Sequence, residues 1–153
     1  MTDPVRIPTL ASLQGRLGER LATSDWVLVD QARIDRFAEA TGDYQWIHVD
    51  RERAAAGPFG TTIAHGFLTL SLIPELADKA MQIDDVQMGV NYGLNRVRFT
   101  APVPSGSRVR AHFMLKDYQP IDGGAQLTME VSVEREGSDK PACIAETVSR
   151  RYT

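Results

Sequence analysis

The densest cluster of reactive side chains in this sequence lies between residues 42 and 66. It comprises Gly42-Asp43-Tyr44-Gln45-Trp46-Ile47-His48 and Ile63-Ala64-His65-Gly66, which hold two of the three histidines of the chain. An aspartate and a histidine five residues apart on a loop can point into one cleft, where a carboxylate meets a group that titrates near neutral pH. Proton transfer in both directions needs such a pair. On spacing alone, the structural alternative is that Asp43 caps a turn and His48 merely precedes a helix cap.

The His65-Gly66 pair stands at the start of an apolar stretch that we predict to be helical. The first N–H groups of a helix have no partner within it and carry partial positive charge. A glycine there lets a ligand oxygen approach the backbone closely, so the Gly66 N–H could stabilise an oxyanion. The alternative is a plain helix start, with glycine chosen for tight packing.

Other kinds of site find little support in the sequence. His48 and His65 are not joined by a His-Glu-x-x-His motif or a cysteine pair, so we predict no metal site. The single Cys143 lies in a strand-like apolar setting, which argues against a nucleophile. Ser71 lacks the Gly-x-Ser-x-Gly context of hydrolases, and no Gly-rich phosphate loop is present.

Length and composition predict one domain spanning residues 1–153. A chain of 153 residues and 16.9 kDa buries about 69% of its surface on folding, which suffices for a core. A net charge of −3 without a basic stripe argues against a nucleic-acid partner. One cysteine fits a reducing compartment. No apolar run is long enough for a membrane span, and the first ten residues lack the apolar stretch of a signal peptide. We therefore expect a cytoplasmic protein with no membrane partner.

The first half of the chain reads as mostly helical. Residues 26–29 form a predicted strand, and Asp30 can cap a helix that stops at Gly42, where positive φ is favoured. Residues 43–48 are then predicted as a loop, and residues 51–56 as a second short helix capped by Asp50. This arrangement predicts that Asp43 lies on a loop leaving a helix.

A longer helix is predicted over residues 64–81, followed by strands. Leu68, Leu72 and Leu76 stack at i, i+4 spacing, whereas Pro74 should kink or break the helix. Hydrophobic and polar residues then alternate, as is typical of antiparallel strands with one solvated face. The predicted strands are residues 94–103, 108–118, 125–136 and 142–152. An apolar helix laid on the dry face of such a sheet makes an α+β fold.

Several segments together resemble one known family. Ala40-Thr41-Gly42-Asp43-Tyr44-Gln45-Trp46-Ile47-His48, with Ala54 following, resembles the hydratase 2 motif of the MaoC-like dehydratases, Gly-Asp-x-Asn-Pro-hydrophobic-His-x5-Ala/Ser. Residues 59–68 and 91–103 look like the second and third blocks of that family. Gln45-Trp46 replaces Asn-Pro, which together with Asn91-Tyr92-Gly93 is similar to the nodulation-protein-N-type branch. Pro74 stands where the family has a hydroxyl-bearing residue, which affects substrate choice more than reaction class.

The resemblance implies a hotdog fold: a long central helix wrapped by an antiparallel sheet of five or six strands, working as a homodimer. The implied reaction is reversible hydration of a trans-2-enoyl thioester of coenzyme A to the (R)-3-hydroxyacyl thioester, with no cofactor beyond the coenzyme A of the substrate. Asp43 and His48 would be catalytic, and the Gly66 N–H would be the oxyanion donor. The expected substrate-binding residues are Gln45, Trp46, His65, Phe67, Asn91, Tyr92 and Gly93.

Two other functions remain open from the sequence. A thioesterase on the same fold would need a carboxylate poised against the thioester carbonyl, and the Asp43–His48 spacing favours the hydratase. A catalytically silent hotdog protein that binds an acyl ligand is the second alternative, because Gln45-Trp46 and Pro74 depart from the family pattern. Fold alone does not exclude it.

Overall fold

The computed structural model describes residues 1–153. The first half holds short elements: β1 (Val5–Ile7), the 3-10 helix η1 (Leu10–Arg16), β2 (Arg20–Thr23), β3 (Val27–Val29), α1 (Gln31–Thr41), α2 (Trp46–Val49) and α3 (Arg51–Ala55). The second half holds α4 (Gly66–Ser71), α5 (Ile73–Ala80), β4 (Met81–Ile83), β5 (Met88–Arg98), β6 (Ser107–Ile121), β7 (Gly124–Arg135) and β8 (Cys143–Tyr152).

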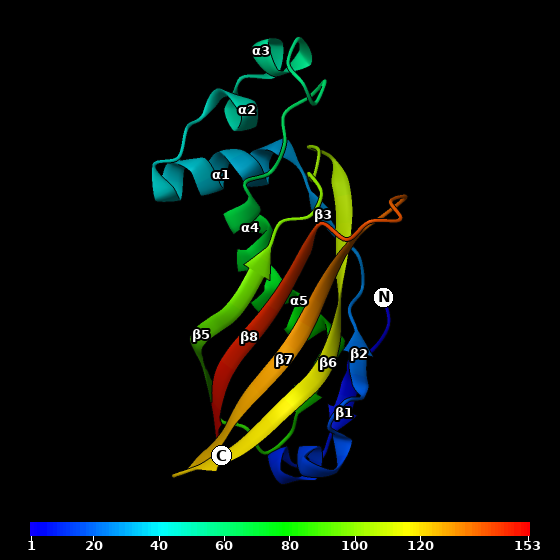
Figure 1. Cartoon of the computed structure of the whole chain (residues 1–153), viewed down its shortest axis with the longest axis vertical. Coiled ribbons are helices and arrows are strands. Elements are labelled where there is room, and N and C mark those ends of the chain that lie inside the picture. Colours follow the sequence, from blue (N-terminus) through cyan, green and yellow to red (C-terminus); the bar gives the residue numbers. More distant parts are fainter.

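A six-stranded antiparallel sheet forms the body of the molecule, with the order β2-β6-β7-β8-β5 and β3 also paired to β6. Figure 1 shows β6, β7 and β8 crossing the molecule side by side, with α4 and α5 behind them. Alternate residues of β7 are buried against these helices, including Leu127, Val131 and Val133. This is the alternation that the sequence predicted, and the arrangement confirms the predicted α+β hotdog architecture.

The central helix is divided in two rather than continuous over residues 64–81. α4 ends at Ser71, Leu72 forms a turn, and α5 begins at Ile73 with Pro74 in its first turn. Proline is tolerated there, because the first N–H groups of a helix have no intrahelical partner. The Leu72 N–H still donates to the Leu68 oxygen, so the break is local. The predicted kink or break is confirmed, and the single long helix is corrected to two shorter ones.

Both halves of the divided helix contribute to the core. Leu68, Leu72 and Leu76, the residues that predicted the helix, are all buried. They pack in one cluster with the inward-facing residues of the sheet, and residues of η1, β2 and β3 complete that cluster. Burial of this apolar face, rather than helix propensity, holds two helices of six and eight residues in place.

Two further predictions are corrected by the structure. The strand predicted at residues 94–103 is β5, Met88–Arg98, because its pairing with β8 starts at Met88 opposite Tyr152. β5 is exposed over nearly its whole length, so it carries no inside–outside alternation that could mark its start. The predicted loop at residues 43–48 is shorter, because Trp46–Val49 forms the single turn of α2.

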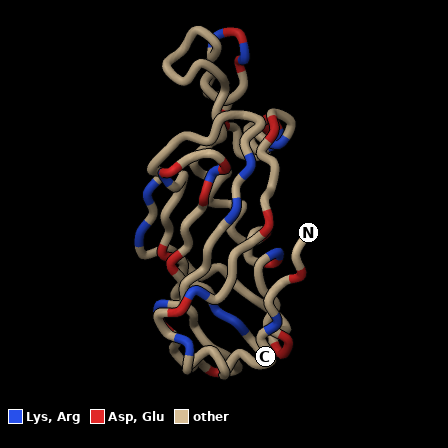
Figure 2. The backbone as a smooth tube through the Cα atoms, turned by 90° about the vertical axis from the view of Figure 1, so that its right-hand side faces the viewer, with Lys and Arg blue, Asp and Glu red and all other residues tan.

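The sheet ends at β5, which pairs with β8 on one side and with nothing on the other. In Figure 1 its arrowhead points toward α4, so the C-terminal end of β5 lies beside the start of that helix. Acidic and basic residues are interspersed along the backbone without a large region of one sign (Figure 2). None of the helices has the length and apolar character that a membrane span requires.

Candidate active site

The end of α1 places Asp43. Asp30 caps the start of this helix, where its Oδ1 accepts a hydrogen bond from the Arg33 N–H at 2.9 Å. Gly42 ends the helix with φ of 79°, and its N–H donates to the Ala38 oxygen. The predicted cap at Asp30 and the predicted stop at Gly42 are both confirmed. Asp43 follows on an exposed turn, and its Oδ1 accepts from the Gln45 N–H at 3.3 Å. The carboxylate therefore makes a turn contact and also faces solvent.

His48 is held inside the protein by α2. Its side chain is only 6% exposed, and its Nδ1 lies 2.7 Å from the Ile63 carbonyl oxygen. Because a carbonyl oxygen only accepts, Nδ1 carries the proton, and in the neutral ring Nε2 keeps its lone pair. Burial is the main cause that lowers the pKa of His48, assisted by His65 and opposed by the Ile63 hydrogen bond and by Asp43. The ring can therefore accept a proton at Nε2 near neutral pH.

His65 contacts both of these residues. Its ring stacks on that of His48, with centroids 3.8 Å apart and planes inclined by 23°. Its Nε2 lies 3.0 Å from the main-chain oxygen of Asp43, so Nε2 donates to that oxygen. The side chain is 2% exposed, and its Nδ1 has no hydrogen-bond partner. The ring of His65 therefore holds His48 by stacking and the main chain of Asp43 by a hydrogen bond. A role of His65 in binding substrate stays a prediction.

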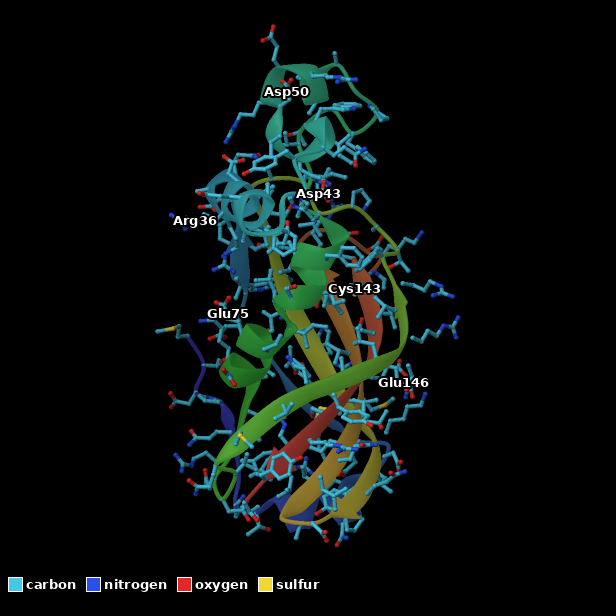
Figure 3. The ribbon with its side chains drawn as sticks, turned by 90° about the vertical axis from the view of Figure 1, so that its left-hand side faces the viewer. Arg36, Asp43, Asp50, Glu75, Cys143 and Glu146 are labelled. Carbon is cyan, nitrogen blue, oxygen red and sulfur yellow. The ribbon has the colours of Figure 1, made fainter.

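Asp43, His48 and His65 thus meet at one point. Figure 3 shows where Asp43 lies, at the upper end of α4. One potential ligand atom of each residue lies within 4.8 Å of the others, which is also a spacing that could attract a metal ion. However, His48 Nδ1 and His65 Nε2 are already engaged with carbonyl oxygens. The prediction of a site without metal stays a prediction. His112 lies elsewhere, on β6, where its Nε2 is 2.7 Å from Glu134.

Gln31 is a supporting residue that the sequence reasoning missed. It is buried at the start of α1, and its Nε2 donates to the main-chain oxygen of His48 at 2.7 Å and to Asp35 at 2.8 Å. Its Oε1 accepts from the Thr62 hydroxyl at 2.5 Å. Gln31, Ile34 and Ala38 share the buried face of α1 at helical spacing, and this periodicity could have revealed a buried polar side chain.

Gly66 opens α4 directly after His65. A Cβ at this position would lie 2.8 Å from Cδ2 of Phe99, so the aromatic ring occupies the space that a larger residue would need. Phe99 follows the C-terminal end of β5 and packs edge-to-face on Phe67, with ring centroids 5.9 Å apart. The glycine therefore has a packing reason. Its N–H lies at the helix start, directly after His65, which contacts Asp43 and His48.

The other predicted binding residues on this side are accessible to different degrees. The side chain of Phe67 is 66% exposed, and Gln45 is also exposed. Trp46 is partly buried, and its ring packs under the Arg53 guanidinium, 4.3 Å from the ring centroid, and against Gly57. Trp46 therefore packs toward α3 and the loop after it. Substrate contacts of these residues remain predictions.

Asn91, Tyr92 and Gly93 lie on β5, away from the cluster. Asn91 stands seven residues before Arg98, which at about 3.3 Å per residue is about 23 Å from the end of the strand that adjoins Gly66. Tyr92 is exposed and stacks under the Arg150 guanidinium, 3.8 Å from its ring centroid. Within one chain these three residues are not brought to Asp43 and His48.

The profile of the MaoC-like domain family matches residues 12–137 of this chain. The chain belongs to the MaoC-like dehydratase family. It is 54% identical over 143 residues to 3-hydroxyacyl-thioester dehydratase Z of Mycobacterium tuberculosis (strain ATCC 25618 / H37Rv), covering 93% of this chain and 95% of the relative. It is 50% identical over 145 residues to nodulation protein N of Rhizobium leguminosarum bv. viciae, covering 92% and 89%. The predicted resemblance, including its branch, is confirmed.

A solved structure of the MaoC-like dehydratase fold also superimposes on this chain. The (R)-hydratase from A. caviae, described as involved in PHA biosynthesis, matches with a TM-score of 0.70 and 22% identity over 87% of this chain and 94% of that one. At this identity the likeness concerns the fold. Together with the family match, it confirms the hotdog fold, and the family and its dehydratase relatives identify an enzyme of the hydratase/dehydratase class.

Proposed function

We propose that this MaoC-like enzyme catalyses the reversible addition of water to a trans-2-enoyl thioester of coenzyme A, giving the (R)-3-hydroxyacyl thioester. One observation carries the proposal: the carboxylate of Asp43 and the buried ring of His48 lie within reach of each other, and His65 contacts both. A titratable pair of this kind is what proton transfer in both directions requires. No cofactor other than the coenzyme A of the substrate enters the proposed reaction.

The proposed proton transfers use the two side chains as a coupled pair. In hydration, the water oxygen bonds to Cβ of the enoyl group, one water proton passes to the Asp43–His48 pair, and the pair delivers one proton to Cα. Dehydration runs the same steps in reverse. His48 Nε2 is the acceptor position on the ring, because Nδ1–H is bound to the Ile63 oxygen. Since interacting groups titrate together, the proton belongs to the pair rather than to one residue.

The negative charge that develops on the thioester oxygen needs a donor as Cβ is attacked. The Gly66 N–H has no partner within α4, and His65, the preceding residue, touches both members of the pair. We place the thioester oxygen at this N–H, which brings Cα and Cβ toward Asp43 and His48. Loss of one such donor typically lowers the rate by about 10²–10³.

We further propose that two copies of the chain pair through β5. Its outer edge offers unpaired backbone groups, and Met88, Val90, Tyr92 and Leu94 are exposed along it. An edge of this kind is a template for a second strand. If two β5 strands pair antiparallel along their full length, Asn91 and Tyr92 of one copy lie opposite Asn95 and Leu94 of the other, nearer to the Gly66 end of that copy than they lie within one chain. This position favours their predicted role in binding substrate. The cytoplasmic location remains a prediction.

The test is hydration of trans-2-enoyl-CoA substrates from C4 to C16. The reaction is monitored by the loss of the enoyl absorbance, and the product is identified by chiral analysis. We expect the (R)-3-hydroxyacyl product, and we expect Asp43→Asn and His48→Gln each to nearly abolish turnover while the far-UV spectrum stays native. Release of free thiol from saturated acyl-CoA instead would identify a thioesterase. Wild-type turnover in both variants would refute the assignment of the pair.

A further inference from the structure

A cavity lies at the opposite end of the molecule from the Asp43–His48 pair. It has a volume of about 330 Å³, which is at the lower end of the range for small-molecule sites. Its walls come from the C-terminal end of α5, from the segment through β4 to Val86, and from the facing strands β7 and β8, near the C-terminus in Figure 1. Its lining residues are Ala77, Asp78, Met81, Gln82, Ile83, Val86, Met129 and Arg151.

Arg151 is the unusual member of this lining. It lies opposite the fully buried Ala125 of β7, on the face of the sheet that the helices cover. Its guanidinium forms no ion pair within 4.0 Å, and its only hydrogen bond runs from Nε to the Ser149 hydroxyl at 3.3 Å. Loss of solvation lowers the pKa of Arg151, and Asp78 acts in the opposite direction. Arg151 is partly buried, and most of its guanidinium donors have no partner on this helix-covered face, so they are free to bind a ligand.

The sheet leaves room for this guanidinium. Gly89 of β5 is the register partner of Arg151, and a Cβ on Gly89 would lie 2.5 Å from Nη1 of Arg151. A side chain at this position would therefore push the guanidinium out of its place. The next arginine, Arg150, projects toward the other face and stacks on Tyr92. The two adjacent arginines thus have different environments, and only Arg151 lines the cavity.

The remaining lining indicates the kind of ligand. Five of the eight lining residues are hydrophobic, so the cavity suits an alkyl chain. A guanidinium presents a fork of donors that matches a carboxylate. Asp78 on the α5 wall carries the same charge as such a ligand and must weaken its binding.

We propose that this cavity binds an alkyl carboxylate, with Arg151 as the residue that recognises the carboxylate. The ligand is either a free fatty acid or the far end of an acyl thioester that bears a second carboxyl group. Binding of the free acid does not depend on the hydratase reaction, because the cavity lies apart from Asp43 and His48, whereas the thioester source rests on the proposed function. It assigns to Gly89 the role of keeping space for the guanidinium.

Calorimetric titration of the full chain with decanoate tests the site, with 1-decanol as the uncharged control. We expect saturable binding of decanoate that is at least ten-fold tighter than that of decanol, since hydrogen bonds to a charged group are strong. Arg151→Met should weaken decanoate binding at least ten-fold, and Asp78→Asn should tighten it several-fold. The matched control Arg150→Met should leave it within about two-fold of wild type.

The outcomes separate clearly. Equal binding of decanoate and decanol, or no saturable binding of either, overturns the proposal, and this comparison needs no variant. Undiminished decanoate binding in a folded Arg151→Met protein also overturns it. If that variant does not fold, Arg151→Gln takes its place, with the same ten-fold criterion, because glutamine removes the charge and keeps a polar side chain. Binding that depends on Arg151 supports the site. Turnover of ω-carboxy-enoyl-CoA then identifies the source of the ligand: if Arg151→Met lowers kcat/KM for this substrate but not for the plain enoyl-CoA, the ligand is the thioester. If kcat/KM for ω-carboxy-enoyl-CoA is equal in Arg151→Met and wild type, the ligand is the free acid.

Discussion

The ring of His65 lies against that of His48, with the two centroids 3.8 Å apart and the planes inclined by 23°. The His65 ring also contacts the ring of Phe37, with centroids 4.8 Å apart and planes inclined by 55°. A hydrogen bond from His65 Nε2 to the Asp43 main chain adds a third contact. The buried ring of His65 therefore fixes the position of the exposed carboxylate relative to the buried imidazole.

Replacing His65 with Phe should lower kcat while preserving the fold. Phe keeps a ring that can stack on His48, but it cannot donate to the Asp43 oxygen. Misplacement of a reactive group by about 1 Å can cost about 10²-fold, so we expect kcat for crotonyl-CoA to fall ten- to a hundred-fold with little change in KM. His112→Phe, at the distant histidine, is the control. A kcat equal to wild type in His65→Phe would contradict this role.

The pH dependence of activity should reflect the low pKa of His48. Burial lowers this pKa below its usual value of 6.5, so the ring stays neutral to a lower pH than a solvated histidine. The acidic limb of kcat/KM should therefore have its midpoint below 6.5. A midpoint at or above 6.5 would show that another group controls this limb.

The free energy of unfolding should also rise with pH because of His48. Because the unfolded chain binds the proton of His48 more readily than the folded chain, the stabilisation is complete above pH 6.5 and is lost as pH falls through the lower folded pKa. Urea unfolding between pH 5 and pH 8 measures this, and in His48→Gln this contribution should disappear. An unchanged pH profile in His48→Gln would argue against the shift.

Gln31→Leu should both destabilise the protein and impair turnover. The substitution leaves the main-chain oxygen of His48 and the Thr62 hydroxyl without partners in a buried setting. An unsatisfied buried polar group costs about 1–3 kcal/mol, so we expect a loss of that size in the free energy of unfolding. Gln14→Leu, on the exposed side of η1, should change it by less than about 0.5 kcal/mol. Similar losses in both variants would contradict the buried network.

Gly66→Ala should be destabilising because of one neighbour. The new methyl group would meet the ring of Phe99 at 2.8 Å, and overpacking of this kind typically costs about 1–3 kcal/mol. In a Phe99→Ala background the methyl group has space, so the cost of Gly66→Ala should largely disappear. Thermal or urea unfolding of the two single variants and the double variant measures the coupling. Additive losses would show that another contact makes Gly66 necessary.

Charges on the open edge should disrupt the proposed dimer. Val90→Glu and Leu94→Glu place acidic groups on exposed positions of β5, where two copies would meet with like charges. We expect sedimentation equilibrium to show at least a ten-fold weaker association than in the wild type. Leu28→Glu, on the exposed side of β3, is the matched control and should leave association unchanged. Unchanged association in the β5 variants would place the interface elsewhere.

Local signals in the sequence determined a large part of the architecture. Asp30 and Gly42 marked the ends of α1 because capping and positive φ depend on neighbouring backbone groups. The alternation in β7 predicted which side chains face the helices. The motif around Asp43 and His48 predicted the candidate pair, because two residues five apart in the sequence can reach one cleft without help from distant segments.

Only the tertiary structure decided the contacts between distant segments. His65 lies 17 residues after His48, and their stacking depends on how α2 and the start of α4 pack. The hydrogen bond from Gln31 to the His48 oxygen depends on how α1 packs against α2. The cavity around Arg151 has walls from α5 and β8, which are far apart in the sequence. The start of β5 was hidden because an edge strand exposed on both faces shows no alternation. Sequence determines what each segment prefers locally, whereas burial of a shared core decides which side chains meet.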